Sequence, residues 1–214
     1  MPGITISSGY GAGGSIVAPM VAERLGLQLL DRAISVAVAS QLNVSIEEAQ
    51  AGAPNRSFIE RLLTFMSPLA SDSLGTPADL DATSASAGIT DEAAVFRDEA
   101  ERLMRAAFAE GAVVLGRAGA AAFRDAPDIL RVRLFGSVEA RVARAQVGLG
   151  GNVDRAAALK QLKQVDHARD QYVRRLYHIS VDDPEVFQLQ IDSIALPLEG
   201  CVEVIVTAYR QLLG

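Results

Sequence analysis

The feature that most constrains the fold of this chain is a glycine-rich turn between a short β-type run and a helical apolar pattern. Residues 4–6 are Ile-Thr-Ile, and glycines follow at Gly9, Gly11, Gly13 and Gly14. Apolar residues then recur at helical spacing from Ile16 to Leu25, and Gly26 is a helix stop signal. A strand, a glycine turn and a helix in this order can bind phosphate, because backbone N–H groups and the positive end of the helix dipole face the anion.

The turn departs from the usual phosphate-binding pattern G-x-x-x-x-G-K-[ST]. If Gly13 is its last glycine, Ser8 stands at the first glycine position and Gly14 stands at the lysine position. The turn by itself therefore leaves two interpretations open, a phosphate site and a tight strand-to-helix connection.

Composition sets the class of protein and limits its partners. The chain has 214 residues, 50% of them hydrophobic and 21% charged, which predicts one globular domain over residues 1–214. A net charge of −6 argues against nucleic acid or anionic lipid as a partner. Cys201 is the only cysteine, which fits a reducing cytosol, and no apolar run reaches 18 residues. We expect a cytoplasmic protein that does not span a membrane; a homo-oligomer is compatible with the sequence.

The order of apolar patterns predicts an α/β fold. A first strand is expected to start near Gly3, and a short apolar run follows at residues 27–30. Further strands are expected near residues 112–116, 129–135 and 187–191, and helical patterns separate them. This order favours a parallel sheet with helices on both faces, in which the strand near Gly3 is central between those at 112–116 and 129–135. Arg131 and Arg133 alternate with apolar residues, so we expect them on a solvated face.

Two further segments are candidates for mobile elements around the site. Residues 67–87 are small and polar without a period, which is typical of a functional flap or of a surface insertion. Gly148 to Gly151 form a break before a long cationic helix that is expected to reach about Tyr177, so residues 148–180 are predicted to form a helical lid. His167 and His178 have no metal-ligand spacing, and we expect no structural metal.

Four separated segments carry a resemblance to a known family. They are Ile4 to Asp31 with "ITI", "VAERLG" and "LLD"; Gly116-Arg117-Ala118-Gly119 with Phe123 to Ala126; Ser137 to Arg144; and Asp166 with Arg169, followed by Ile191-Asp192-Ser193. Taken in order, these segments resemble the cytidylate kinase family, and most closely its divergent branch whose glycine loop lacks the lysine. Residues 38–95 match this family poorly.

This resemblance implies a P-loop NTPase three-layer α/β fold with a flap within residues 38–95 and a helical lid. It also implies transfer of the γ-phosphoryl group of ATP, with Mg²⁺, to CMP, dCMP or a related small acceptor. The implied catalytic residues are Arg117, Asp166 and Arg169, and Ser15 is the weak candidate for a Mg²⁺ contact. The implied nucleotide- or phosphate-binding residues are Gly9, Gly11, Gly13, Gly14, Ser15 and Asp31, with Arg174 and Arg175 added on position and charge.

Several of these residues also have a purely structural interpretation. Arg117 could form an ion pair at a strand end, and Asp31 could cap the helix that follows it. Asp166 and Arg169 lie three residues apart on a helix and could pair with each other on the surface.

The departures from the family pattern leave two functions open. Gly14 removes the loop cation, Ile16 stands where a hydroxyl is expected, Ala118 replaces an acidic residue, and an expected arginine falls near Ala37. One interpretation is a nucleotide kinase in which lid arginines replace the missing charge. The other is a non-catalytic nucleotide- or phosphate-binding protein with a degenerate P-loop. For a weakened kinase, Gly14→Lys is expected to strengthen ATP binding unless Gly14 has a positive φ.

Overall fold

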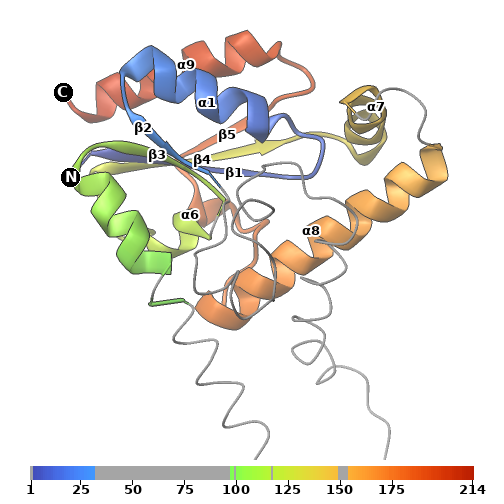
Figure 1. Ribbon diagram of the computed structural model, residues 1–214, viewed down its shortest axis with the longest axis horizontal. Coiled ribbons are helices and arrows are strands. Elements are labelled where there is room, and N and C mark those ends of the chain that lie inside the picture. The colour runs from blue at the N-terminus through green and yellow to red at the C-terminus, as the bar shows by residue number, and fades with distance from the viewer. Residues whose placement is uncertain (1, 32–96, 99, 117, 149–153) are drawn as a thin grey trace, which may run out of the picture.

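A computed structural model describes residues 2–31, 97–98, 100–116, 118–148 and 154–214 of the chain (Figure 1). Several predicted features lie outside the described residues: the flap region within residues 38–95 with its segment 67–87, Arg117, and residues 149–151 of the expected break.

The described strands form one parallel sheet with the first strand at its centre. They are β1 (Gly3–Ser8), β2 (Gln28–Leu30), β3 (Ala112–Leu115), β4 (Ile129–Phe135) and β5 (Leu189–Asp192). Their order is β2-β3-β1-β4-β5, and Gly3 lies beside both Ala112 and Ile129. The predicted central place of the first strand, between the strands at 112–116 and 129–135, is therefore confirmed.

Helices cover both faces of this sheet, as predicted (Figure 1). The helices α1 (Gly14–Leu25) and α9 (Leu198–Leu212) pack on one face. On the other face lie α6 (Gly119–Ala122), α8 (Arg155–Tyr177) and a helix whose described residues are 97–98 and 100–109. The short η2 (Pro184–Val186) precedes β5, and α7 (Val138–Gly148) lies beyond the carboxyl end of β4.

The alternation of side chains along β1 joins it to both helical layers. Ile4 and Ile6 are fully buried in a cluster with Val17 of α1 and Ile205 of α9. Thr5, between these two residues, faces α6 on the opposite side of the sheet. A Cβ atom added at Gly119 would lie 3.0 Å from the methyl group of Thr5. Only the carboxyl end of β1 is partly exposed, and there the chain enters the glycine turn.

A second cluster fills the layer on the α6 side of the sheet. Phe108 and Phe123 meet edge to face, with ring centroids 5.0 Å apart, and Met104 and Val114 pack around them. Edge-to-face contacts of this kind add to the stabilisation that comes from burial. The two clusters hold the sheet rigidly between its layers, which gives the glycine turn a fixed platform.

The expectation that Arg131 and Arg133 lie on a solvated face is wrong. Arg131 is only 9% exposed, and the side chain of Arg133 is 15% exposed. Segments after α8 cover this side of β4, so that Arg133 contacts the carbonyl of Val181 and the carboxylate of Asp182. Burial lowers the pKa of both guanidinium groups below the usual arginine value. The polar face of a strand can be exposed to water or covered by other segments of the chain. The local sequence pattern does not distinguish these two cases.

Candidate phosphate site at the glycine loop

The glycine loop, residues 9–13, joins the carboxyl end of β1 to the first residue of α1. Gly11 has a φ of 76° and Gly13 a φ of 83°, in the left-handed region that favours glycine. A side chain at Gly11 would also collide with the backbone of Arg141. The turn therefore requires both glycines, and the close approach of α7 requires Gly11 in addition.

The loop presents the amino-terminal end of α1 without a side-chain cap. The first intrahelical bonds run from the N–H groups of Ile16 and Val17 to the carbonyl of Gly13, each at 3.0 Å. No side chain caps this end and its first turn contains no acidic residue. The N–H groups of the first turn and the helix dipole thus favour an anion here. Ser15, the candidate Mg²⁺ contact, is exposed in the same turn.

Asp166 of α8 and Arg141 of α7 meet on this loop. The Asp166 carboxylate accepts the N–H of Tyr10 at 2.8 Å and an Arg141 N–H at 2.6 Å. Arg141 also donates to the carbonyl of Tyr10 at 3.1 Å and, through Nε, to that of Gly136 at 3.0 Å. One guanidinium and one carboxylate therefore connect both helices to the same residue of the loop.

Arg169, on the next turn of α8, reaches Ser8, the last residue of β1 before the loop. Its guanidinium donates to the carbonyl of Ser8 at 3.0 Å and lies 3.9 Å from Asp166. The two side chains do face each other, but each also binds the loop, so a surface pair does not describe them. Burial raises the pKa of the nearby Tyr10 hydroxyl, and the positive charge of Arg169 opposes that shift.

Arg144 and Ser193 support the outer side of the loop. The Ser193 hydroxyl donates to the carbonyl of Ala12 at 2.7 Å, and Arg144 Nη2 donates to the carbonyl of Ser193 at 2.7 Å. Arg144 Nη1 is buried and has no hydrogen-bond partner within the described part of the chain. A side chain added at Gly13 would lie 3.3 Å from this nitrogen. A buried guanidinium N–H beside the loop fits a ligand that carries hydrogen-bond acceptors, such as a nucleotide.

The other predicted site residues lie elsewhere or are not described. Asp31 is partly buried directly after β2. Arg174 binds Asp170 at 2.6 Å and the Ser180 hydroxyl at 3.0 Å near the carboxyl end of α8, and Arg175 is partly buried beside it. The residues on either side of Arg117 form the turn after β3, where the Gly116 N–H binds the carbonyl of Ile6 in β1 at 2.9 Å.

The sequence pattern predicted no role for Arg141, Arg144, Tyr10 or Ser193, although all four lie in segments that resemble the family. A signal was present for the two arginines. They lie one helical turn apart at the start of the helix that follows β4, and Ser137 caps this turn by accepting the Ala140 N–H at 3.3 Å. Because β1 and β4 are parallel neighbours, their carboxyl ends share one edge of the sheet.

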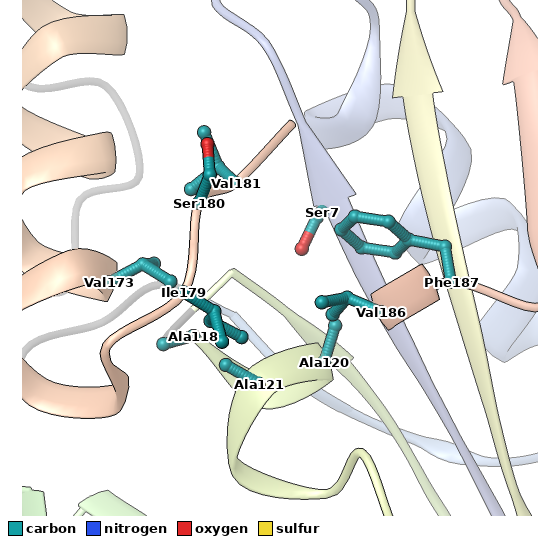
Figure 2. A pocket seen from close by; sticks show the side chains of 10 residues that line it. All are labelled: Ser7, Ala118, Ala120, Ala121, Val173, Ile179, Ser180, Val181, Val186 and Phe187. Carbon is teal, nitrogen blue, oxygen red and sulfur yellow. The ribbon is translucent and has the colours of Figure 1, made fainter. Parts of the chain in front are cut away.

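A small apolar pocket lies on the opposite side of β1 from α1 (Figure 2). Figure 2 shows the Ser7 hydroxyl and the Phe187 ring on one side of it, and Val173 of α8 across from them. Its lining carries no charged side chain, so it does not by itself recognise a phosphate. The lining residues are Ser7, Ala118, Ala120, Ala121, Val173, Ile179, Ser180, Val181, Val186 and Phe187.

Neither a metal cluster nor a membrane span is found in the part of the chain that the structure describes. No three His, Cys, Asp or Glu side chains there gather in a way that could hold a metal ion. No helix there is both long enough and apolar enough to cross a bilayer.

The parallel sheet between two helical layers, with a glycine loop leading from its central strand into a helix, defines the three-layer α/β fold of the P-loop kinases. The model of the cytidylate kinase-like family matches residues 3–195, and the chain belongs to this family. Among curated proteins, no sequence matches it.

Solved structures match this chain at low sequence identity, and the first of those below, with a TM-score above 0.5, has the same fold. An uncharacterized protein from Eubacterium ventriosum ATCC 27560 matches with a TM-score of 0.64 and 18% identity, over 98% of each chain. A shikimate kinase from Bacteroides thetaiotaomicron matches with a TM-score of 0.48 and 11% identity, over 99% of this chain and 98% of that one. A gluconokinase from Sinorhizobium meliloti 1021 matches with a TM-score of 0.47 and 17% identity, over 99% of this chain and 93% of that one.

Proposed function

We propose that this protein is a phosphotransferase that moves the γ-phosphoryl group of ATP to CMP, dCMP or a related small acceptor. The observation that carries the proposal is the convergence of two guanidinium groups, those of Arg141 and Arg169, on the glycine loop at the end of the central strand. Membership of the cytidylate kinase-like family supports the same class of reaction.

The residues of the chain would act mainly by position and charge. ATP with Mg²⁺ would supply the transferable phosphoryl group and the charge of the metal. The N–H groups of the loop and of the first turn of α1 hold the phosphates, with Ser15 as the candidate metal contact. Arg141 and Arg169 stabilise the negative charge that the phosphoryl group carries. Arg117, which follows β3, is assigned to the acceptor phosphate by family resemblance.

A second candidate function is a nucleotide- or phosphate-binding protein without turnover. Two observations favour it: the lysine position is glycine, and the Asp166 carboxylate already holds both the Tyr10 N–H and Arg141. In such a protein a bound phosphate would compete with Asp166 for these donors. The contact of α8 with the loop would then respond to the ligand.

A coupled assay of ADP release, with Mg-ATP and a panel of nucleoside monophosphates, tests the proposal. The parent protein is expected to turn over with at least one pyrimidine monophosphate, and Arg169→Ala is expected to abolish this turnover. Arg24→Ala is the matched control, because Arg24 is an exposed arginine paired with Glu203 at the far end of α1. ATP binding without turnover for any acceptor would support the second candidate. Turnover that survives Arg169→Ala would contradict the role given to this arginine.

A further inference from the structure

Ser8 occupies the space that a side chain at the lysine position of the loop would need. Gly14 is not among the glycines with a positive φ, so its backbone conformation suits any L-residue. The obstacle is steric: a Cβ atom at position 14 would lie 2.7 Å from Ser8 Cβ, close to the Ser8 hydroxyl, and 3.3 Å from a Leu115 methyl group.

Neither Ser8 nor Gly14 can move away from the other without loss of packing. Ser8 pairs with Leu134 in the parallel ladder of β1 and β4, so its Cβ is fixed by the sheet. Gly14 opens α1, whose Val17 and Val21 are completely buried against that sheet. Closely packed layers of this kind do not absorb a shift of several tenths of an ångström without loss of contacts.

Ser8 also binds the guanidinium group of Arg169, which comes from α8. Its carbonyl accepts the 3.0 Å hydrogen bond from Arg169. Three features therefore coincide at this place. Ser8 has a side chain, position 14 has none, and Arg169 of α8 binds the carbonyl of Ser8.

We propose that Ser8 and Gly14 form a reciprocal pair that has moved the cation of the phosphate site from the loop to Arg169 of α8. The inference rests on the proposed function only in so far as the loop binds phosphate. Because the loop has no lysine, the phosphate site has the positive charge of Arg169 only while α8 is docked on the loop. Docking of α8 therefore brings this charge to the phosphate.

A direct consequence is that Gly14→Lys alone does not restore a lysine loop. The sequence expectation considered only the backbone φ of Gly14, whereas the structure shows that Ser8 blocks the new side chain. Ser8→Gly removes both blocking atoms, so the lysine can enter only in the double variant Ser8→Gly with Gly14→Lys.

The packing part of the proposal is tested without any ligand, by thermal unfolding of Gly14→Ala in three backgrounds, each compared with the same background without it. Gly14→Ala alone is expected to lower the melting temperature by several degrees. In a Ser8→Gly background the same substitution should cost much less. In a Ser8→Ala background, which keeps the blocking Cβ, the cost should stay close to that in the parent. Equal losses in all three backgrounds would overturn the reciprocal pair.

The charge part is tested by titration calorimetry with Mg-ATP, with and without Arg169→Ala. In the parent, Arg169→Ala is expected to weaken binding at least about tenfold, the usual effect of losing a hydrogen bond to a charged group. In the Ser8→Gly/Gly14→Lys background the loss should fall below about threefold, because an ammonium is again in the loop. Arg24→Ala should leave the affinity unchanged in both backgrounds.

The failures of the two proposals are distinguishable. An equal loss on Arg169→Ala in both backgrounds would overturn the exchange of cations while the phosphate site stands. Absence of Mg-ATP binding in the parent would overturn the phosphate site and the exchange with it. The unfolding measurements would still report on the packing of Ser8 against Gly14.

Discussion

At the scale of single residues, backbone carbonyl groups help to hold three arginines of this protein, Arg131, Arg141 and Arg169. Arg169 binds the carbonyl of Ser8, Arg141 binds those of Tyr10 and Gly136, and Arg131 binds three carbonyls near α6 and η2. A carbonyl fixes the direction of a guanidinium and does not cancel its charge. Around the loop, the carbonyls orient two guanidinium groups that share one carboxylate, that of Asp166, so the three side chains together carry a net positive charge.

Arg131 provides a test of how much this arrangement stabilises the fold. Arg131→Met removes the donor to the Val186 carbonyl and one of two donors to the carbonyls of Phe123 and Ala126, which keep backbone N–H partners. We expect the free energy of unfolding to fall by about 2–3 kcal/mol, measured by urea denaturation. Arg124→Met is the control: Arg124 is half-exposed and pairs with the exposed Asp125. A loss below about 0.5 kcal/mol for both variants would contradict this account of Arg131.

Ala118 offers a second test at this scale, in the turn after β3. It has a φ of 54°, in the left-handed region where an L-residue with a Cβ is strained. Ala118→Gly is expected to raise the free energy of unfolding by about 0.5–1 kcal/mol, because the relief of strain exceeds the entropy cost of glycine. Ala120→Gly, within α6, should instead lower it by about 1 kcal/mol. Loss of stability in the Ala118 variant would show that its Cβ makes contacts worth more than the strain.

At the scale of elements, α8 connects separate parts of the molecule through polar contacts. Its buried residues are few for 23 positions: Ala158, Leu162, Val173 and Leu176. Its ties to the loop are the hydrogen bonds of Asp166 and Arg169, and its tie to the segment after it is Asp170. Movement of such a helix exposes little apolar surface to water. This property suits an element that closes on a ligand.

Asp170 allows the tie at the carboxyl end of α8 to be measured through pH. Burial would raise the pKa of this carboxyl, but hydrogen bonds from Arg174, the Val181 N–H and Ser180 hold it below the usual value. The carboxylate therefore stabilises the fold above the unfolded-state pKa of about 3.9, and this contribution is lost as the pH falls through the lower folded-state pKa.

We therefore expect Asp170→Asn to melt at a lower temperature than the parent at pH 7, with the difference shrinking as the pH falls below about 3.9. Thermal melts across this range measure it. Asp125→Asn, at a position that is 94% exposed, should show little difference at either pH. A constant difference at all pH values would assign the effect to something other than the charge of Asp170.

At the scale of the whole molecule, the site lies at one edge of the sheet where the carboxyl ends of β1, β3 and β4 meet (Figure 1). Ligands of open parallel sheets bind at this edge, because the chain changes direction there and leaves a crevice. Buried clusters cover both faces of the sheet and support this edge, and the proposed function assigns closure on a ligand to α8.

This arrangement predicts where a nucleotide changes protection in hydrogen exchange. On addition of saturating Mg-ATP, amides of the glycine loop and of the middle of α8 are expected to exchange more slowly, because the ligand adds contacts to both. Amides of β1 and β4 should be slow with and without ligand, since their ladder is enclosed in the core. Unchanged exchange in both the loop and α8 at saturation would contradict closure of α8 on the loop.

The sheet could be predicted because its signals are local. Ile4 and Ile6 alternate with small polar residues, Val113 and Val114 lie in a short apolar run, and helical spacing separates the strands. The βαβ order then leaves few arrangements, and the central place of β1 follows from them. The faces of β4 could not be assigned in this way, because the burial of Arg131 depends on loops from distant parts of the chain.

By itself, the sequence determined that this chain builds a parallel sheet with a glycine turn at the end of its first strand. Only the tertiary structure decided what surrounds that turn. The bond between Tyr10 and Asp166 spans 156 residues, that between Arg141 and Tyr10 spans 131, and the contact of Ser8 with Gly14 depends on how closely α1 packs on β1. A residue pattern records the local preference of each segment, whereas these contacts are set by the distances between packed layers.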